Sequence, residues 1–399
     1  MGCTGDGVRC AGARPAPHRT GGSRVTLPTH FNPYAVHVPV TRGGIPKSPP
    51  RDDHPLIAWQ DESHAGQWVD VDHAQDQLQR FDEVLDRIAD LVNPGVDQGS
   101  LVVVTGPRGM GKTTLIHQCI YRAILHIEQM GDDAAAAGFP RPITRHVVAM
   151  TAGYGNNGRA ISRDENGEIA SAAVINANIR EKVFATLRAH FPNAGLDPSM
   201  SEERPFKAFG RISSVLAEQQ ALLFVVVPHI DWTDQGSLRT QFLDTCLSAA
   251  QSRIVLFVEI SHETTETAGE AVEALMPNDA VTHLMLGGLR EGDTVKFSQD
   301  TGADHSDPDE APLPTWQPAD VRELRQACHA VADGQIREGR TVRVTARDLN
   351  LHAAARDPLQ LQSLRRRPVR PYPRPGPAPA DPDRQPHRPG PTPGPTPDP

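Results

Sequence analysis

The residues best suited to chemistry lie in one glycine-rich run, Gly106-Pro107-Arg108-Gly109-Met110-Gly111-Lys112-Thr113, followed by Thr114. Glycines at this spacing let backbone N–H groups turn inward toward an anion, because no Cβ stands in the way. Lys112 can reach the outer phosphates of a nucleotide, and the Thr113 hydroxyl can ligate Mg²⁺. Thr114 can hydrogen-bond near the α-phosphate. The pattern therefore predicts a nucleotide phosphate site over residues 106–114.

The elements around this run alternate between strand and helix patterns. Short apolar runs predict strands over 101–104, 146–150, 222–227, 254–258 and 281–286. Apolar residues at helical spacing predict helices over 81–92, 113–129, 173–190, 206–219 and 237–250. Strands that alternate with helices favour a mostly parallel sheet covered on both faces. The dipole of the helix that opens at Lys112 would point its positive end at the bound phosphates.

Composition divides the chain into four predicted zones. Apolar residues make up only 38% of the 399 residues, while glycine (33) and proline (37) are abundant. We expect a disordered or loosely docked arm over 1–55, an α/β core over 56–314 and a small helical lid over 315–358. A Pro/Arg-rich disordered tail is predicted for 359–399, because proline-rich chain favours extended, solvated conformations.

Charge and cysteine usage exclude several classes of protein. The net charge of −9 argues against a wholly basic nucleic-acid coat protein, although a local basic patch is compatible with it. No apolar run approaches 18 residues, so no membrane-spanning helix is expected. The five cysteines are widely spaced with no CxxC pair, which favours a reducing compartment. The first 25 residues hold no apolar signal region, so the cytoplasm is the expected location.

The glycine-rich run resembles the Walker A loop of P-loop NTPases. Over about 70–360 the layout resembles the AAA+ and STAND branch, including origin-recognition-type and transposition-helper ATPases. The likeness rests on residues 101–115 and on the later segment 284–293, which is similar to the entry to a lid. It implies an α/β P-loop fold, a parallel sheet sandwiched by helices, with a small C-terminal helical lid. It also implies ATP with Mg²⁺, and the chain holds no Asn-Lys pair of the guanine-binding type.

The acids that such ATPases need after a neighbouring strand are displaced in this sequence. In the family pattern, four apolar residues precede an Asp that holds Mg²⁺ and a second acid that polarises the attacking water. Here strand 222–227 is followed by Pro228 and His229 at those two places, and Asp231 comes late. Either Asp231, with Asp234, supplies the catalytic and metal-binding carboxylate, or Asp231 is a loop acid and turnover is slow.

Glu259 is the second candidate catalytic acid. It ends the strand at 254–258, which in the family layout carries a polar sensor of the γ-phosphate, and Ser261 is an alternative for that role. A surface acid at a strand end is the plainer interpretation. For a trans-acting or lid arginine, the resemblance offers Arg290, Arg347 and Arg356.

The leading functional hypothesis is an ATP-binding protein that uses Mg-ATP to drive a conformational or assembly switch, with slow hydrolysis. The alternative is an active AAA+ ATPase that remodels a protein or nucleic-acid complex. The partners implied are ATP, an unidentified protein, and a second copy of the chain in a homo-oligomer. The charge balance gives no indication of nucleic acid, and no membrane partner is expected.

Overall fold

The computed structural model describes residues 32–36, 55–69, 71–93, 95–136, 138, 144, 146–153, 160–163, 166, 168–230, 236–261, 272–290, 292–300 and 317–356. The chain divides into two units, Met1–Ala353 and Ala354–Pro399. Of the second unit, only 354–356 are described, and they form the end of a helix.

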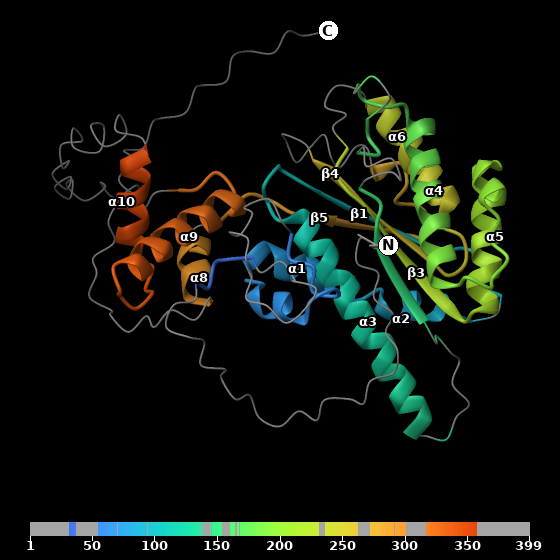
Figure 1. The fold of residues 1–399 in the computed structure, drawn as a ribbon, viewed down its shortest axis with the longest axis horizontal. Coiled ribbons are helices and arrows are strands. Elements are labelled where there is room, and N and C mark those ends of the chain that lie inside the picture. Colours follow the sequence, from blue (N-terminus) through green and yellow to red (C-terminus); the bar gives the residue numbers. More distant parts are fainter. Residues whose placement is uncertain are drawn as a thin grey trace, which may run out of the picture. The chain divides into compact units, whose positions relative to one another are not determined.

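Five parallel strands form the sheet (Figure 1). They are β1 (Ser100–Gly106), β2 (His146–Thr151), β3 (Ala221–Val227), β4 (Ile254–Ser261) and β5 (Val281–Met285), in the spatial order β2-β3-β4-β1-β5. In the register of β1 with β4, Val104 lies beside Glu259 and Gly106 beside Ser261. The predicted α/β fold with a parallel sheet is confirmed, and the carboxyl ends of β1, β3 and β4 meet at one edge.

The strands are buried on both faces because helices cover each side. Alternate residues of a strand point to opposite faces, so Val102 and Val104 belong to one core cluster, whereas Leu101 and Val103 belong to the other. The first face is covered by α1 (Asp72–Asp82), α2 (Leu85–Asp90) and α3 (Lys112–Ala136). The second is covered by α4 (Ala172–His190), α5 (Pro205–Glu218) and α6 (Gly236–Ala249), which Figure 1 shows on the side of the sheet away from α3.

Two helix boundaries differ from the sequence prediction. The stretch predicted as one helix over 81–92 is split, because Val84 leaves the helical conformation between α1 and α2. The helix predicted over 113–129 continues to Ala136, since the polar residues that end the apolar periodicity are themselves compatible with a helix. In the described part of the chain, two short 3₁₀ helices, η1 (Glu62–Gln67) and η2 (Pro198–Glu202), lie in connecting segments.

Three further helices follow the sheet: α8 (Asp293–Asp300), α9 (Val321–Arg337) and α10 (Ala346–Arg356). Asp320 caps α9, accepting a hydrogen bond from the Glu323 N–H at 2.7 Å. Thr345 caps α10, since its hydroxyl accepts from the Asp348 N–H at 3.2 Å. The last two helices occupy the range of the predicted lid, whose role as a lid stays a prediction.

A short strap at Asn32–Val36 packs against α8 and α9. The Tyr34 side chain is buried and stacks on Phe297, with ring centroids 6.3 Å apart. Arg325 donates to the Tyr34 carbonyl at 3.1 Å, and the Asn32 amide donates to the His329 carbonyl at 3.0 Å. The strap therefore joins the beginning of the chain to α9.

Among the described residues, no helix combines the length and the apolar character that crossing a bilayer requires.

Candidate nucleotide site

The glycine-rich loop runs from the end of β1 to the first residue of α3. Gly109 and Gly111 have φ values of +83° and +82°, which residues with a Cβ rarely adopt. At Gly106, an added Cβ would lie 2.7 Å from the Leu286 carbonyl oxygen. The loop therefore needs glycine at these places, and its backbone can approach a bound group closely.

Lys112 is buried at the mouth of this loop, with 3% of its surface exposed. Its ammonium donates to the Pro107 carbonyl at 2.8 Å and lies 3.7 Å from a Glu259 carboxylate oxygen. Burial lowers the pKa of Lys112, and the Glu259 charge partly opposes that effect. The Lys112 ammonium is thus positioned by one carbonyl of the loop and by one carboxylate of β4.

Glu259 also contacts the residue after that lysine. The Thr113 hydroxyl donates to the other Glu259 carboxylate oxygen at 2.5 Å, and only 8% of Glu259 is exposed. This follows from the sheet order, because β4 lies directly beside β1 and its end faces the loop. The structure therefore brings together Lys112, Thr113 and Glu259. A hydroxyl and a carboxylate are hard oxygen donors of the kind Mg²⁺ prefers, so this donor set fits the metal.

The end of β3 gives a different result. The Ser261 N–H donates to His229 Nδ1 at 3.3 Å, which links the residues after β3 to the end of β4. Because a backbone N–H can only donate, Nδ1 is the acceptor and a neutral ring carries its proton on Nε2. Asp231 and Asp234 lie outside the described residues, so their roles stay predictions.

The start of α9 contacts the glycine loop. The Arg322 N–H donates to the Gly109 carbonyl at 3.3 Å. A Cβ added at Gly109 would overlap the Asp320 carboxylate, which is held in place as the cap of α9. The Arg322 charge is close enough to contribute to the lowered pKa of Lys112. The loop is therefore packed against the N-terminus of α9.

Asp320 and Arg322 were missed by reasoning from the sequence. The Asp-x-x-Glu spacing at 320–323 signals a helix start, but nothing in the sequence places that start against the loop. Among the arginines that were predicted, Arg290 is exposed and lies 3.6 Å from Asp76, while Arg347 is exposed on α10. No contact between described residues joins either of them to the loop. The side chain of Arg356 lies outside the described residues.

A buried hydrogen bond fixes the second turn of α3. The Trp59 indole N–H donates to His117 Nδ1 at 3.0 Å, and His64 Nδ1 accepts from the Ile57 N–H at 3.0 Å. Burial lowers the pKa of His117 to about 3, so the ring is neutral. Residues 55–69 are thereby tied to the helix that begins at Lys112.

The loop and the sheet order together define the class of this protein. A glycine loop between β1 and α3, at the edge of a parallel sheet, is the architecture of a P-loop NTPase. The AAA ATPase domain family matches residues 80–258, just under half of the chain. The predicted likeness to the AAA+ ATPases is confirmed, and the match supports a nucleotide-binding ATPase. Members of the family generally bind ATP with Mg²⁺.

Several solved structures align with part of the chain at low identity and with TM-scores below 0.5. The Aeropyrum pernix ORC2 protein, in its ADPNP-ADP complexes, aligns with a TM-score of 0.39 and 12% identity over 70% of this chain and 67% of that one. The Aeropyrum pernix ORC1 protein in complex with DNA aligns with a TM-score of 0.37 and 15% identity, over 73% of this chain and 67% of that one. Cdc6p from Pyrobaculum aerophilum aligns with a TM-score of 0.32 and 15% identity, over 74% of this chain and 64% of that one. No curated protein matches the chain in sequence.

Proposed function

We propose that this chain binds Mg-ATP at the glycine loop and uses the bound nucleotide to drive a conformational or assembly switch, with slow hydrolysis. The observation that carries the proposal is the packing of the loop against α9. The Gly109 carbonyl accepts from Arg322, and the Asp320 carboxylate leaves no room for a side chain at Gly109. A rearrangement of the loop around phosphates would therefore displace the N-terminus of α9.

Each loop residue has a defined part in this proposal. The backbone N–H groups of the loop would bind the phosphates, and the α3 dipole would favour the negative charge there. Lys112 exchanges its Pro107 carbonyl partner for phosphate oxygens. Thr113 and Glu259 would hold the Mg²⁺ ion, which would supply positive charge against the phosphates. Glu259 would thus supply the carboxylate that the family pattern places at the position of Pro228.

The expectation of slow hydrolysis rests on the residues after β3. Proline has no proton-accepting side chain, and the His229 Nδ1 lone pair is occupied by the Ser261 N–H. A base that polarises the attacking water must have a lone pair directed at that water. The active remodelling ATPase remains the second candidate, favoured by the contact of Glu259 with both Lys112 and Thr113.

The partner class follows from the switch. A protein partner or a second copy of the chain would bind to one position of α9 and not to the other. The acidic balance of the whole chain offers no argument for nucleic acid.

Thiol labelling tests the switch because α9 carries a buried cysteine. Cys328 is fully buried and its pKa is raised to about 12 by burial. In a chain with Cys3→Ser and Cys10→Ser, ATP with Mg²⁺ should change the Cys328 labelling rate several-fold. Cys119 and Cys246, which are buried in the α3 and α6 cores, should remain unreactive and serve as internal controls.

Direct binding of a fluorescent ATP analogue completes the test. Lys112→Ala should abolish binding, whereas Lys207→Ala, at an exposed lysine on α5, should leave it unchanged. Binding without any change at Cys328 would refute the switch and leave a nucleotide site. No binding by the wild type would refute the whole proposal. Single-turnover hydrolysis that is complete within the mixing time of the reactants would favour the remodelling ATPase.

A further inference from the structure

A cavity lies among α4, α6 and the chain that enters α5, and none of its lining residues belongs to the glycine loop. It has a volume of about 410 Å³, within the usual range for small-molecule pockets. Residues at four-residue spacing build two of its walls: Ala172, Asn176 and Arg180 on α4, and Gln241 and Thr245 on α6. The remaining wall comes from residues 202–205 before and at the start of α5.

Arg180 is a buried cation on the wall of this cavity. Only 8% of the residue is exposed, and its Nε donates to the Ser201 carbonyl, which fixes the guanidinium at the cavity wall. Among the described residues, no ion pair joins Arg180 to an acid. Burial lowers the pKa of Arg180. Buried charges in proteins are normally paired, because an unpaired one loses its hydration without compensation.

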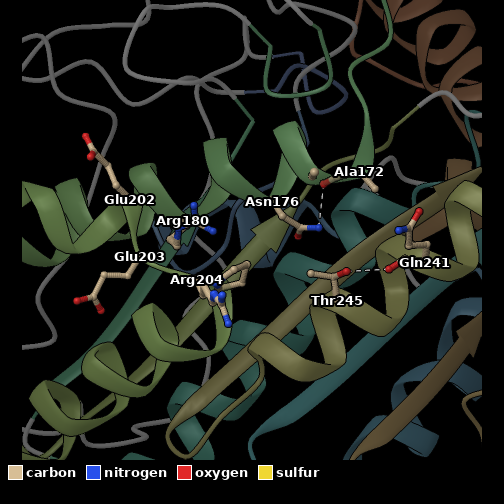
Figure 2. Close-up of a pocket in the computed structure, with 10 residues that line it drawn as sticks. Ala172, Asn176, Arg180, Glu202, Glu203, Arg204, Gln241 and Thr245 are labelled. Carbon is tan, nitrogen blue, oxygen red and sulfur yellow. Dashed lines mark hydrogen bonds between the residues drawn. The ribbon is translucent and has the colours of Figure 1, made fainter.

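Arg204 lines the same cavity and is also without an acid partner in the described part of the chain. The two acids nearby do not fill this role. Glu203 is held by Lys207 at 3.0 Å and by Arg211 at 2.9 Å. Figure 2 shows the carboxylates of Glu202 and Glu203 directed away from Arg180 and Arg204. Two guanidinium groups therefore border a cavity whose acids are either neutralised or turned away.

The polar side chains on the opposite side can complete a ligand's contacts. The Asn176 amide donates one N–H to the Ala172 carbonyl, as drawn in Figure 2, which leaves a second N–H and the amide oxygen for the cavity. Gln241 lies across from it on α6. Ala173 and Pro205 add apolar surface to the lining.

We infer that this cavity binds a small organic anion that carries a carboxylate or phosphate group, with the oxyanion held by Arg180 and Arg204. Planar guanidinium groups bind both kinds of oxyanion through paired N–H donors. The volume admits a small molecule, and the apolar wall fits a short carbon skeleton. The site is separate from the glycine loop, because α4 and α6 cover the sheet face opposite to α3.

The test uses the full-length chain with Lys112→Ala, so that the glycine loop does not bind the probe. Thermal unfolding and titration calorimetry are followed with inorganic phosphate, with acetate, and with chloride at equal ionic strength. We expect saturable binding of phosphate or acetate beyond the chloride effect, and the stronger of the two identifies the source of the oxyanion. Arg180→Gln should weaken that binding about tenfold or more, since a charge-assisted hydrogen bond is lost.

Two further variants keep the outcome decisive. Arg204→Gln changes an exposed side chain and should weaken binding without disturbing the fold, which covers the case in which Arg180→Gln fails to fold. Arg188→Gln, at an exposed position of the same helix, should leave binding unchanged. Equal stabilisation of all variants by phosphate and acetate, or no binding beyond that of chloride, would overturn the inference.

Discussion

Replacing Glu259 by Gln is the sharpest test of the proposed nucleotide site. The change keeps the size of the side chain and an oxygen that can accept from Thr113, but it removes the negative charge. At 3.7 Å from Lys112, and with an effective dielectric constant of about 20, the lost attraction is about 4 kcal/mol before desolvation is counted. The Pro107 carbonyl still accepts from Lys112, so we expect a net loss of about 1–3 kcal/mol in the free energy of unfolding.

The effect on nucleotide binding should depend on the metal. Without Mg²⁺, Glu259→Gln should bind ATP at least as well as the wild type, because a carboxylate no longer repels the phosphates. With Mg²⁺, the wild type should gain affinity, and the variant should lose about 10- to 100-fold of that gain. The assay is equilibrium binding of a fluorescent ATP analogue with and without Mg²⁺, together with electron paramagnetic resonance of Mn²⁺ in its place.

Two controls make the result interpretable. Glu218→Gln, at an exposed position near the end of α5, should leave the Mg²⁺ effect intact. Pro228→Asp combined with Glu259→Gln places a carboxylate directly after the neighbouring strand β3 and should restore part of the effect. A Glu259→Gln protein that binds ATP and retains the full Mg²⁺ effect would refute the assignment of the metal carboxylate to Glu259.

Three other predictions concern the supports of the site. Gly109→Ala should lower the free energy of unfolding more than Gly111→Ala, because the two glycines have nearly the same positive φ but only Gly109 faces the Asp320 carboxylate. Chemical denaturation of the two variants measures the difference. Equal losses of stability would contradict the contact. His117 has a folded-state pKa of about 3, below its unfolded value of about 6.5, so the unfolded chain binds the proton more readily. Its contribution to stability is therefore full above about pH 6.5 and falls toward pH 3, by about 2 kcal/mol between pH 7 and pH 5. Urea titrations at these two pH values should show this slope in the wild type and less of it in His117→Gln. A chain that starts at residue 37 should be less stable than one that starts at residue 31 by a few kcal/mol, because it loses the buried Tyr34 ring; equal denaturation midpoints would contradict this.

The fold and the loop could be predicted because their signals are local. A glycine spacing, five apolar runs and four-residue periodicities each lie within a short stretch of sequence. The role of Glu259 could not be settled in this way. Its contact with Thr113 depends on β4 lying beside β1, and the sequences of the individual strands do not determine which strands are neighbours. The same holds for Asp320, which follows the loop by more than 200 residues.

The strap at Asn32–Val36 has a consequence for the order of events during synthesis. Its partners on α9 lie 291 and 297 residues further along the chain. The ribosome releases the strap long before Arg325 and His329 exist, and domains form as their parts emerge. The strap can therefore dock only after nearly the whole α/β core has been synthesised. Its docking is a late step that closes the folded unit, and it makes the first described residues of the chain among the last to find their place.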